Sequence, residues 1–283
     1  MNKSEKLKRH IVRLFNQRSV GKTDVEIKNI VFDSRNVEEG DVFVAIKGAA
    51  VDGHAFIDSA IKSGATVIVC ESKPDKVEGG INYIVVEDAH FALSVMANNY
   101  YDQPGKKLEL IGITGTNGKT TTTTLLFQLF REMGSSVGLI STVVNRINDE
   151  EIPTERTTPD PVSLNALLQQ MVDAGCDYCF MEVSSHAIHQ KRIGKLYFSG
   201  GAFTNITNEH LDYHKSFKEY LNVKKEFFDG LSKEAFAVTN VDDKNGEVML
   251  QNCDARKITY GLKNIADYKA KVLENNSQSP QPI

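Results

Sequence analysis

The fold is decided by a stretch that reads Ile111-Gly112-Ile113-Thr114-Gly115-Thr116-Asn117-Gly118-Lys119-Thr120-Thr121. It follows the apolar run 108–111, which predicts a strand, and it precedes residues 122–133, where apolar side chains recur at helical spacing. A strand, a glycine-rich turn and a helix are the context of a phosphate-binding loop. We therefore expect backbone N–H groups to hold a polyphosphate, with Lys119 at the outer phosphates and the Thr120 hydroxyl on magnesium.

The spacing of the glycines departs from the usual phosphate-binding loop. Ile113 stands where the usual loop has its first glycine, and Gly112 and Gly115 lie on either side of it. An ordinary tight turn between a strand and a helix is the alternative interpretation. The strand and the helix around the turn favour the phosphate-binding loop.

Composition limits the class of protein. The chain has 283 residues, of which 41% are hydrophobic and 25% charged, and this suits one large or two ordinary globular domains. Its formal net charge of −4 does not indicate nucleic acid as a partner. No apolar run is long enough to span a bilayer, and residues 1–9 are polar and rich in lysine. We expect a cytoplasmic monomer that binds neither nucleic acid nor membrane.

The four cysteines are Cys70, Cys176, Cys179 and Cys253. Cys176 and Cys179 have the spacing of a redox pair, in which the first cysteine usually lies at a helix N-terminus. Here the two cysteines instead lie at the start of a predicted strand. No second pair completes a zinc site. The cysteines are therefore predicted to be buried and structural.

The first hundred residues alternate between strands and helices. Strands are predicted at residues 27–32, 42–46, 65–70 and 81–86, and helices at 7–15, 55–62 and 90–101. The cluster Asp102-Gln103-Pro104-Gly105 breaks this pattern. We place a domain boundary there, with one domain at residues 1–105 and a second at 106–283.

The second part also alternates, which predicts an α/β fold with a mostly parallel sheet. Strands are expected at residues 137–141, 178–183, 201–205 and 236–240, and a helix at 217–231. Another helix has Asp160 as its N-cap and Pro161 as its first residue, and it ends near residue 174. Residues 145–158 are predicted to be a polar loop, and residues 274–283 a disordered tail.

A family resemblance strengthens this interpretation. Residues 114–121 resemble the ATP loop of the Mur ligases, the ATP-dependent amide ligases of peptidoglycan precursor synthesis. Asp33-Ser34-Arg35, residues 40–45, Gly48 and Asp52-Gly53 are similar to the UDP domain of the branch that adds the third residue of the stem peptide.

The resemblance covers the chain to about Ala270. It implies a small N-terminal α/β domain that binds the UDP-substrate, followed by a mostly parallel P-loop ATPase domain, incomplete at its C-terminal end. The family's third domain has no counterpart, so the resemblance implies a fragment or a truncated gene model.

The resemblance also implies site residues. The residues implied to bind ATP are Gly115, Thr116, Asn117, Gly118, Lys119, Thr120, Thr121 and Asn205. Those implied to bind the UDP-substrate are Phe32, Ser34, Ala49, Ala50, Val51, Thr157, Thr158, Ser184, Gln190 and Arg192. The implied magnesium ligands are Thr120, Glu182, His210 and Lys224. The implied catalytic residues are Lys119, His210 and Lys224, the last as a carbamate.

Glu182 ends a predicted parallel strand, and ligand groups collect at the carboxyl ends of such strands. A carboxylate beside a phosphate loop there favours a magnesium ligand over a solvated strand end. Ser184 and His186 could indicate a hydrolase, but the nucleophile pattern Gly-x-Ser-x-Gly is absent.

His210 and His214 are four residues apart, a spacing that would put both on one face of a helix. Zinc binding is the alternative, but no third ligand follows at a suitable spacing. The resemblance assigns a metal only to His210, as a ligand of a second magnesium.

Lys224 falls on the apolar stripe of the predicted helix 217–231, whereas its neighbour Lys225 is expected to be an ordinary surface lysine. An interior lysine tends to lose its proton, and a neutral amine can react with carbon dioxide to give a carbamate. A snorkelling lysine is the alternative. The resemblance implies the carbamate, because Lys224 follows His210 at the family's spacing.

The function implied by the resemblance is an ATP-dependent ligase that extends UDP-N-acetylmuramoyl-L-alanyl-D-glutamate by a diamino acid through an acyl phosphate. The resemblance favours meso-diaminopimelate as the third residue, because it is common in the family, and L-lysine is the alternative. The related folylpolyglutamate synthase branch is a second interpretation, against which the UDP-like first domain argues. A fragment that binds UDP-substrate or ATP without turnover is the third.

Overall fold

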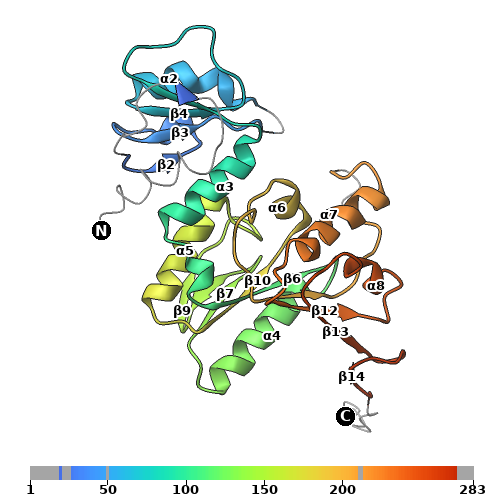
Figure 1. Cartoon of the computed structure of the whole chain (residues 1–283). Coiled ribbons are helices and arrows are strands. Elements are labelled where there is room, and N and C mark those ends of the chain that lie inside the picture. The colour runs from blue at the N-terminus through green and yellow to red at the C-terminus, as the bar shows by residue number, and fades with distance from the viewer. Residues whose placement is uncertain (1–18, 21–26, 49–50, 210–212, 273–283) are drawn as a thin grey trace, which may run out of the picture.

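The computed structural model describes residues 19–20, 27–48, 51–209 and 213–272. Two β-sheets with their helices follow one another along the chain (Figure 1). No helix in these residues is long and apolar enough to cross a membrane. The helix predicted at residues 7–15 and the predicted tail lie outside the described residues.

The first sheet has the strand order β1-β5-β4-β3-β2. Strands β2 to β5 are parallel, and β1 pairs antiparallel with β5. The strands are β1 (Ser19–Val20), β2 (Ile30–Val31), β3 (Val42–Val44), β4 (Val67–Cys70) and β5 (Asn82–Val85). The helices are the 3-10 turns η1 (Ser34–Asn36) and η2 (Gly53–Phe56), then α2 (Ile57–Lys62) and α3 (Ala89–Tyr100).

This sheet is buried on both faces, as parallel sheets usually are. Val42 and Val44 point into one apolar cluster with Leu93 of α3, and Phe43 points into another with Ile57 of α2. The predicted elements therefore exist, but strands β2 and β3 are shorter than their apolar runs.

Helix α3 leads from the first sheet to the second and packs against α5 (Pro161–Asp173) (Figure 1). After it, Asp102 and Gln103 adopt positive φ angles of 60° and 53°, and the turn η3 (Pro104–Lys106) follows. The chain changes direction there before β6 (Glu109–Thr114) begins. We retain a domain boundary near residue 105 as a proposal.

The second sheet has the order β14-β13-β12-β11-β6-β10-β7-β8-β9. It is parallel from β14 to β7, with an antiparallel hairpin at the other edge. Its further strands are β7 (Val137–Ile140), β8 (Asn145–Ile147), β9 (Glu150–Ile152), β10 (Tyr178–Glu182), β11 (Gly200–Phe203), β12 (Phe236–Asn240), β13 (Arg256–Gly261) and β14 (Tyr268–Lys269). Its further helices are α4 (Lys119–Glu132), α6 (Ser185–His189), α7 (Phe217–Asp229) and α8 (Gly246–Met249).

The polar loop predicted at residues 145–158 is wrong in its first half, because β8 and β9 form a hairpin there. Asn148 makes the tight turn with a φ of 53°, a conformation that asparagine tolerates better than most residues. Its side-chain oxygen also accepts hydrogen bonds from Val137 N at 2.9 Å and Ser136 Oγ at 2.8 Å. The charged side chains of this edge hairpin concealed the strands from the sequence pattern.

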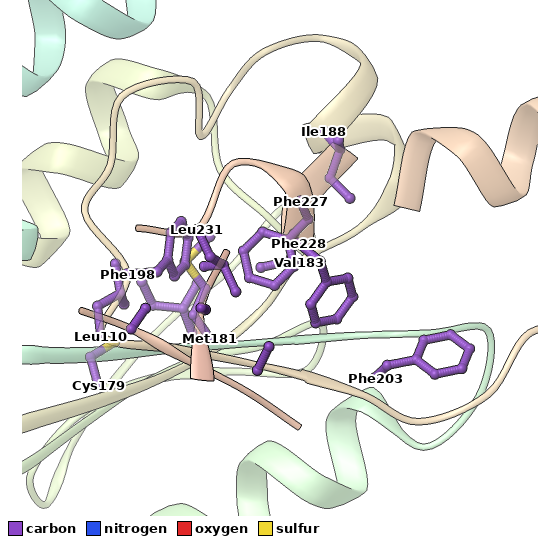
Figure 2. Packing of buried hydrophobic residues seen from close by; sticks show 14 of the residues in the cluster. Leu110, Cys179, Met181, Val183, Ile188, Phe198, Phe203, Phe227, Phe228 and Leu231 are labelled. Atoms are coloured by element: carbon purple, nitrogen blue, oxygen red, sulfur yellow. The ribbon is translucent and has the colours of Figure 1, made fainter. Parts of the chain in front are cut away.

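Helices cover both faces of the second sheet, with α4 on one face and α5, α6 and α7 on the other (Figure 1). Along β6, Ile111 and Ile113 pack towards α4, whereas Leu110 packs into the larger core on the opposite face. Figure 2 shows that core, with Phe227 and Phe228 of α7 among its members. A Cβ at Gly112 would lie 2.6 Å from Phe227 Cζ, so glycine allows α7 to approach this closely.

Candidate active site

The candidate site lies where the strand order of the second sheet reverses. The chain leaves β6 for β7, returns to β10 beside β6, and then adds β11 on the other side of β6. Ligands of open α/β folds bind outside the carboxyl ends of strands at such a switch point. The loop from residue 115 to 118 leaves β6 there and leads into α4.

The glycines of this loop are needed for its shape. Gly115 has a φ of 150°, and a Cβ there would lie 2.0 Å from Thr204 Oγ1. Gly118 has a φ of 85° and directly precedes α4. A side chain at the first position would clash and at the second would be strained.

Residues after β11 hold the loop in place. Thr116 N donates to Asn205 O at 2.7 Å, and Asn117 N donates to Asn205 Oδ1 at 3.0 Å. Asn205 Nδ2 and Thr204 Oγ1 both donate to Asn117 O, at 3.0 and 2.7 Å. Asn205, predicted to bind ATP, therefore acts at least on the shape of the loop.

A cleft of about 510 Å³ opens above the loop. It is lined by Thr116, Asn117, Gly118, Lys119, Thr120, Thr142, Arg156, Thr157, Thr158, Glu182, Ser184, Ser185, His186, Arg192 and Lys224. Most of the predicted ATP, metal and substrate residues of the second sheet thus meet in one place, although they come from six separate stretches of sequence. Gly115, Thr121, Gln190 and Asn205 do not line this cleft.

The predicted UDP-substrate residues of the first sheet do not reach this cleft. Phe32 lines a second cavity of about 480 Å³ with residues from the 145–170 region. Ser34 and Val51 line neither cavity. Asp33 accepts hydrogen bonds from Arg35 N at 3.1 Å and Arg35 Nε at 2.9 Å, and this pairing lowers the pKa of Asp33 to about 2. Ala49, Ala50 and His210 lie outside the described residues.

Lys119 starts α4 and folds back over its own loop. Its Nζ donates to Gly115 O at 3.0 Å and to Thr116 O at 2.7 Å. Burial lowers the pKa of Lys119, although the carboxylates of Glu182 and Glu209 act in the opposite direction. Within the described part of the chain, the ammonium at the cleft therefore has only carbonyl oxygens as hydrogen-bond acceptors.

Lys224 faces the interior, as its position on the apolar stripe predicts. It is 1% exposed, and its Nζ donates to Gly115 O at 2.9 Å and lies 4.7 Å from the centre of the Tyr220 ring. Burial, and then the like charge of Lys119, lower the pKa of Lys224 to about 7. Lys119 and Lys224 thus share one carbonyl oxygen at the floor of the cleft.

The prediction that Lys225 is an ordinary surface lysine is wrong. It is 8% exposed, and its Nζ donates to the Asp229 carboxylate at 2.6 and 2.8 Å. The two residues are one helical turn apart, which brings their side chains together. The long apolar stem of Lys225 is covered while its ammonium is neutralised.

Glu182 is fully buried at the end of β10, where Oε1 accepts from Thr142 N at 2.8 Å and Oε2 from Thr142 Oγ1 at 3.1 Å. The described residues contain no group of three or more His, Cys, Asp or Glu that could hold a metal. Magnesium is commonly held by one or two protein oxygens together with phosphates and water. The Glu182 carboxylate and the Thr120 hydroxyl, both in the cleft, fit such an ion when a nucleotide brings the phosphates.

Thr158, Ser184 and Arg192 form one network on the wall of the cleft. Thr158 Oγ1 donates to Glu182 O at 2.9 Å and lies 3.3 Å from Ser184 Oγ. Arg192 Nη1 donates to Thr158 O at 2.7 Å. Gln190 lies behind the wall, where its Oε1 accepts from Arg192 Nε at 3.0 Å and Nη2 at 2.6 Å.

His214 lies in a turn before α7 rather than in a helix. The alternative in which His210 and His214 share one face of a helix is therefore wrong for His214. Its ring is fully buried, and neither ring nitrogen has a hydrogen-bond partner among the residues that the structure describes. Burial lowers its pKa, with smaller contributions from His186 and His189. His214 is therefore a neutral packing residue against Tyr220, 5.2 Å away between ring centres.

Several residues at or beside the site were missed from the sequence. Thr142, Arg156 and Ser185 line the cleft, and Arg156 also lines the cavity that contains Phe32. Tyr213 accepts a hydrogen bond from Gln190. Thr142 could have been found, because it follows a predicted parallel strand at the edge where ligands bind. The cysteines are free and buried, as predicted.

Comparisons with known proteins agree with this geometry. Residues 113–281 match the family model for the Mur ligase middle domain, and residues 26–101 match that for the Mur ligase family, catalytic domain. A curated relative, UDP-N-acetylmuramoyl-L-alanyl-D-glutamate–2,6-diaminopimelate ligase from Parabacteroides distasonis, is 55% identical over 93% of this chain and 54% of the relative. The ligase of the same name from Clostridium tetani is 42% identical over 91% of this chain and 53% of the relative.

A solved structure, also of a UDP-N-acetylmuramoyl-L-alanyl-D-glutamate–2,6-diaminopimelate ligase, has a TM-score of 0.75 at 26% identity and covers 86% of this chain and 50% of that one. The chain spans about half the length of the curated relatives it matches. Because the middle-domain match alone extends over more than half of its residues, this chain belongs to the Mur ligase family.

Proposed function

We propose that the chain carries the nucleotide and UDP-substrate sites of an ATP-dependent amide ligase. The substrate is UDP-N-acetylmuramoyl-L-alanyl-D-glutamate, and the amino acid added is 2,6-diaminopimelate in its meso form. The observation that carries the proposal is the single cleft in which the 115–118 loop meets Lys119, Glu182, Arg192 and Lys224.

The loop and Lys119 bind the nucleotide. Backbone N–H groups at the start of α4 face the phosphates, and Lys119 turns from its own carbonyl oxygens to the outer phosphate oxygens. Thr120 and Glu182 would hold a magnesium ion, which would supply positive charge against the negative charge that develops during phosphoryl transfer.

The substrate carboxylate attacks the γ-phosphate of ATP, which gives an acyl phosphate and ADP. The amine of the diamino acid then adds to the acyl carbon, and phosphate leaves. Arg192 and Lys119 line the cleft where a carboxylate would meet the phosphate loop. Cations fixed there stabilise the negative charge that spreads over the transferring group.

The route of the substrate is indicated by Arg156, which lines both the cleft and the cavity that contains Phe32. A long substrate with its UDP end near Phe32 and its peptide end at Lys119 would pass this guanidinium. We propose that Arg156 contacts an anionic group of the substrate on this route, in addition to Thr157 and Thr158.

Lys224 is proposed to react as a neutral amine with carbon dioxide. The nitrogen lone pair forms the new N–C bond, and an amine proton leaves to water. The product is an anionic carbamate, an oxygen donor that suits magnesium. His210 is proposed to share this role.

The identity of the third residue rests on the relatives. The curated relatives that are 55% and 42% identical are 2,6-diaminopimelate ligases, which supports this diamino acid over L-lysine.

Calorimetry of the 283-residue chain with a non-hydrolysable ATP analogue and magnesium, and separately with the UDP-substrate, tests the proposal. Lys119→Ala should weaken nucleotide binding about 100-fold, since it removes a charge-assisted contact to phosphate in a partly dry site. Binding of the UDP-substrate should change less than about twofold. Lys106→Ala, on an exposed lysine at the end of η3 and before β6, is the matched control.

Normal nucleotide affinity in Lys119→Ala would overturn the phosphate-loop assignment. A wild-type chain that binds both ligands but releases no phosphate when diaminopimelate is added would support the binding-only alternative.

A further inference from the structure

We propose that Tyr213 is a positioning residue that fixes the Arg192 guanidinium in the cleft through the side chain of Gln190. This inference deepens the proposed function, on which it rests for the identity of the ligand that Arg192 meets. Neither Tyr213 nor Gln190 lines the cleft, so any effect of Tyr213 on a bound ligand must pass through another side chain.

The chain of contacts starts at the Tyr213 hydroxyl. It lies 2.9 Å from His189 Nδ1 and accepts a hydrogen bond from Gln190 Nε2 at 3.2 Å. The tyrosine ring packs on the ring of His186, with 4.0 Å between their centres. Tyr213 thus contacts three residues in or directly after α6, which are His186, His189 and Gln190.

The Gln190 amide is held between Arg192 and the Tyr213 hydroxyl. A guanidinium can only donate, so Oε1 of Gln190 faces Arg192 and accepts from Nε and Nη2. This orientation leaves Nε2 of Gln190 at the opposite end of the amide, where it donates to the Tyr213 hydroxyl. The hydroxyl therefore anchors the far end of the amide and limits its rotation away from Arg192.

Arg192 is otherwise weakly held. Its remaining contact is Nη1 to Thr158 O at 2.7 Å, and none of the described carboxylates forms an ion pair with it. Burial and the nearby Arg156 lower the pKa of its guanidinium. A guanidinium that contacts neutral oxygens remains available to an anionic ligand. The orientation of the guanidinium in the cleft depends on those oxygens. Of the three hydrogen bonds that Arg192 makes to described residues, Gln190 accepts two.

The first test needs no ligand. Tyr213→Phe keeps the ring that packs on His186 and removes only the hydroxyl. We expect phenylglyoxal to modify Arg192 about three to ten times faster in this variant, since a net hydrogen bond is worth about 1 kcal/mol. Mass spectrometry of the 283-residue chain measures the rate of modification. Arg156, exposed on the same cleft, is the internal control and should react at an unchanged rate.

Tyr83→Phe, in the first sheet, is a matched control variant. It also removes one tyrosine hydroxyl, which accepts a hydrogen bond from Glu78 N. It should leave Arg192 unchanged. Equal modification of Arg192 in wild type and Tyr213→Phe would overturn the proposal, whether or not the chain binds the UDP-substrate.

The second test is a double-mutant cycle on binding of the UDP-substrate. Tyr213→Phe should weaken binding about fivefold in the wild-type background and not at all in an Arg192→Met background. An equal loss in both backgrounds would show a general structural role and contradict positioning through Arg192. If the wild-type chain does not bind the UDP-substrate, the proposed function fails, while the phenylglyoxal result still decides the role of Tyr213.

Discussion

The cations of the cleft and the cations elsewhere on the second sheet are satisfied in different ways. Lys119, Lys224 and Arg192 donate to backbone carbonyl or amide oxygens. By contrast, Arg131 pairs with Asp149 and Lys225 pairs with Asp229. The clearest case is α7, where two adjacent buried lysines belong to opposite groups.

This difference separates basic side chains that serve the site, as ligand-binding cations or, for Lys224, as a reactive amine, from cations that stabilise the fold. A buried cation without a carboxylate costs stability, and proteins keep such groups where they serve function. A cation that is already neutralised by a carboxylate offers little to an anionic ligand. We therefore expect substitutions in the cleft to change binding and chemistry, and substitutions of the paired cations to change the free energy of unfolding.

The largest expected effect concerns carbamylation and is all or none. With ¹³C-labelled bicarbonate at pH 8, the wild-type chain should show a carbamate carbonyl resonance in its ¹³C NMR spectrum, because the amine of Lys224 is mostly neutral there. Lys224→Arg should lose this signal, since a guanidinium stays protonated.

The neighbouring lysine provides the control for that experiment. Lys225→Met should keep the carbamate resonance, because Lys224 is unchanged in this variant and the Lys225 ammonium is engaged by the Asp229 carboxylate. A resonance that persists in Lys224→Arg, or none in the wild type, would contradict the assignment.

The second effect is a pH dependence of stability. In buffer free of carbon dioxide, Lys224 is neutral in the folded chain above its pKa of about 7, whereas the unfolded amine keeps its proton up to about pH 10.5. The unfolded state therefore binds one more proton, and stability rises with pH across this window by up to about 1.4 kcal/mol per pH unit.

Urea unfolding of the wild type and of Lys224→Met at pH 7.5 and 9.5 measures this term. The stability of the wild type relative to the variant should rise by about 2 kcal/mol between the two pH values. A constant difference would mean that Lys224 keeps its proton in the folded chain.

Much of the fold could be predicted from the sequence because its strands are buried on both faces. Continuous apolar runs such as 137–141 and 178–183 predicted β7 and β10. The β8–β9 hairpin was missed because its short strands contain charged and polar residues, with Glu150 and Glu151 exposed at the edge of the sheet. Strand β13 was missed for a similar reason, since Arg256 and Lys257 begin it at an exposed position.

The site was predictable where a residue's role depends on local sequence. The loop around Lys119 and the interior position of Lys224 follow from strand, turn and helix patterns. The pairing of Lys225 with Asp229 and the approach of Tyr213 to Gln190 depend on how α7 and α6 pack, which no local pattern describes. The same holds for Arg156, which is recognised only because two cavities meet at its side chain.

A smaller effect is expected at Arg156. Arg156→Ala should weaken binding of the UDP-substrate about tenfold and leave nucleotide binding unchanged, because one charge-assisted contact is lost. Arg146→Ala, which removes a cation already paired with Glu151 on the nearby hairpin, should leave both affinities unchanged. Calorimetry with each ligand measures the four values. Equal affinities for the UDP-substrate in wild type and Arg156→Ala would remove Arg156 from the substrate route.

The smallest effect is expected at Lys225. Methionine keeps most of the covered apolar stem and removes the ammonium, which leaves the Asp229 carboxylate without its partner. Because Asp229 is partly exposed, water replaces much of the lost interaction, and Lys225→Met should cost about 1 kcal/mol in the free energy of unfolding. Lys218→Met, at an exposed position of the same helix, should change it by less than about 0.5 kcal/mol. Urea unfolding at pH 7.5 compares the two variants, and nucleotide binding should be the same in both. A loss of nucleotide affinity in Lys225→Met without loss of stability would show that the paired lysine belongs to the cleft and would break the division between the two groups of cations.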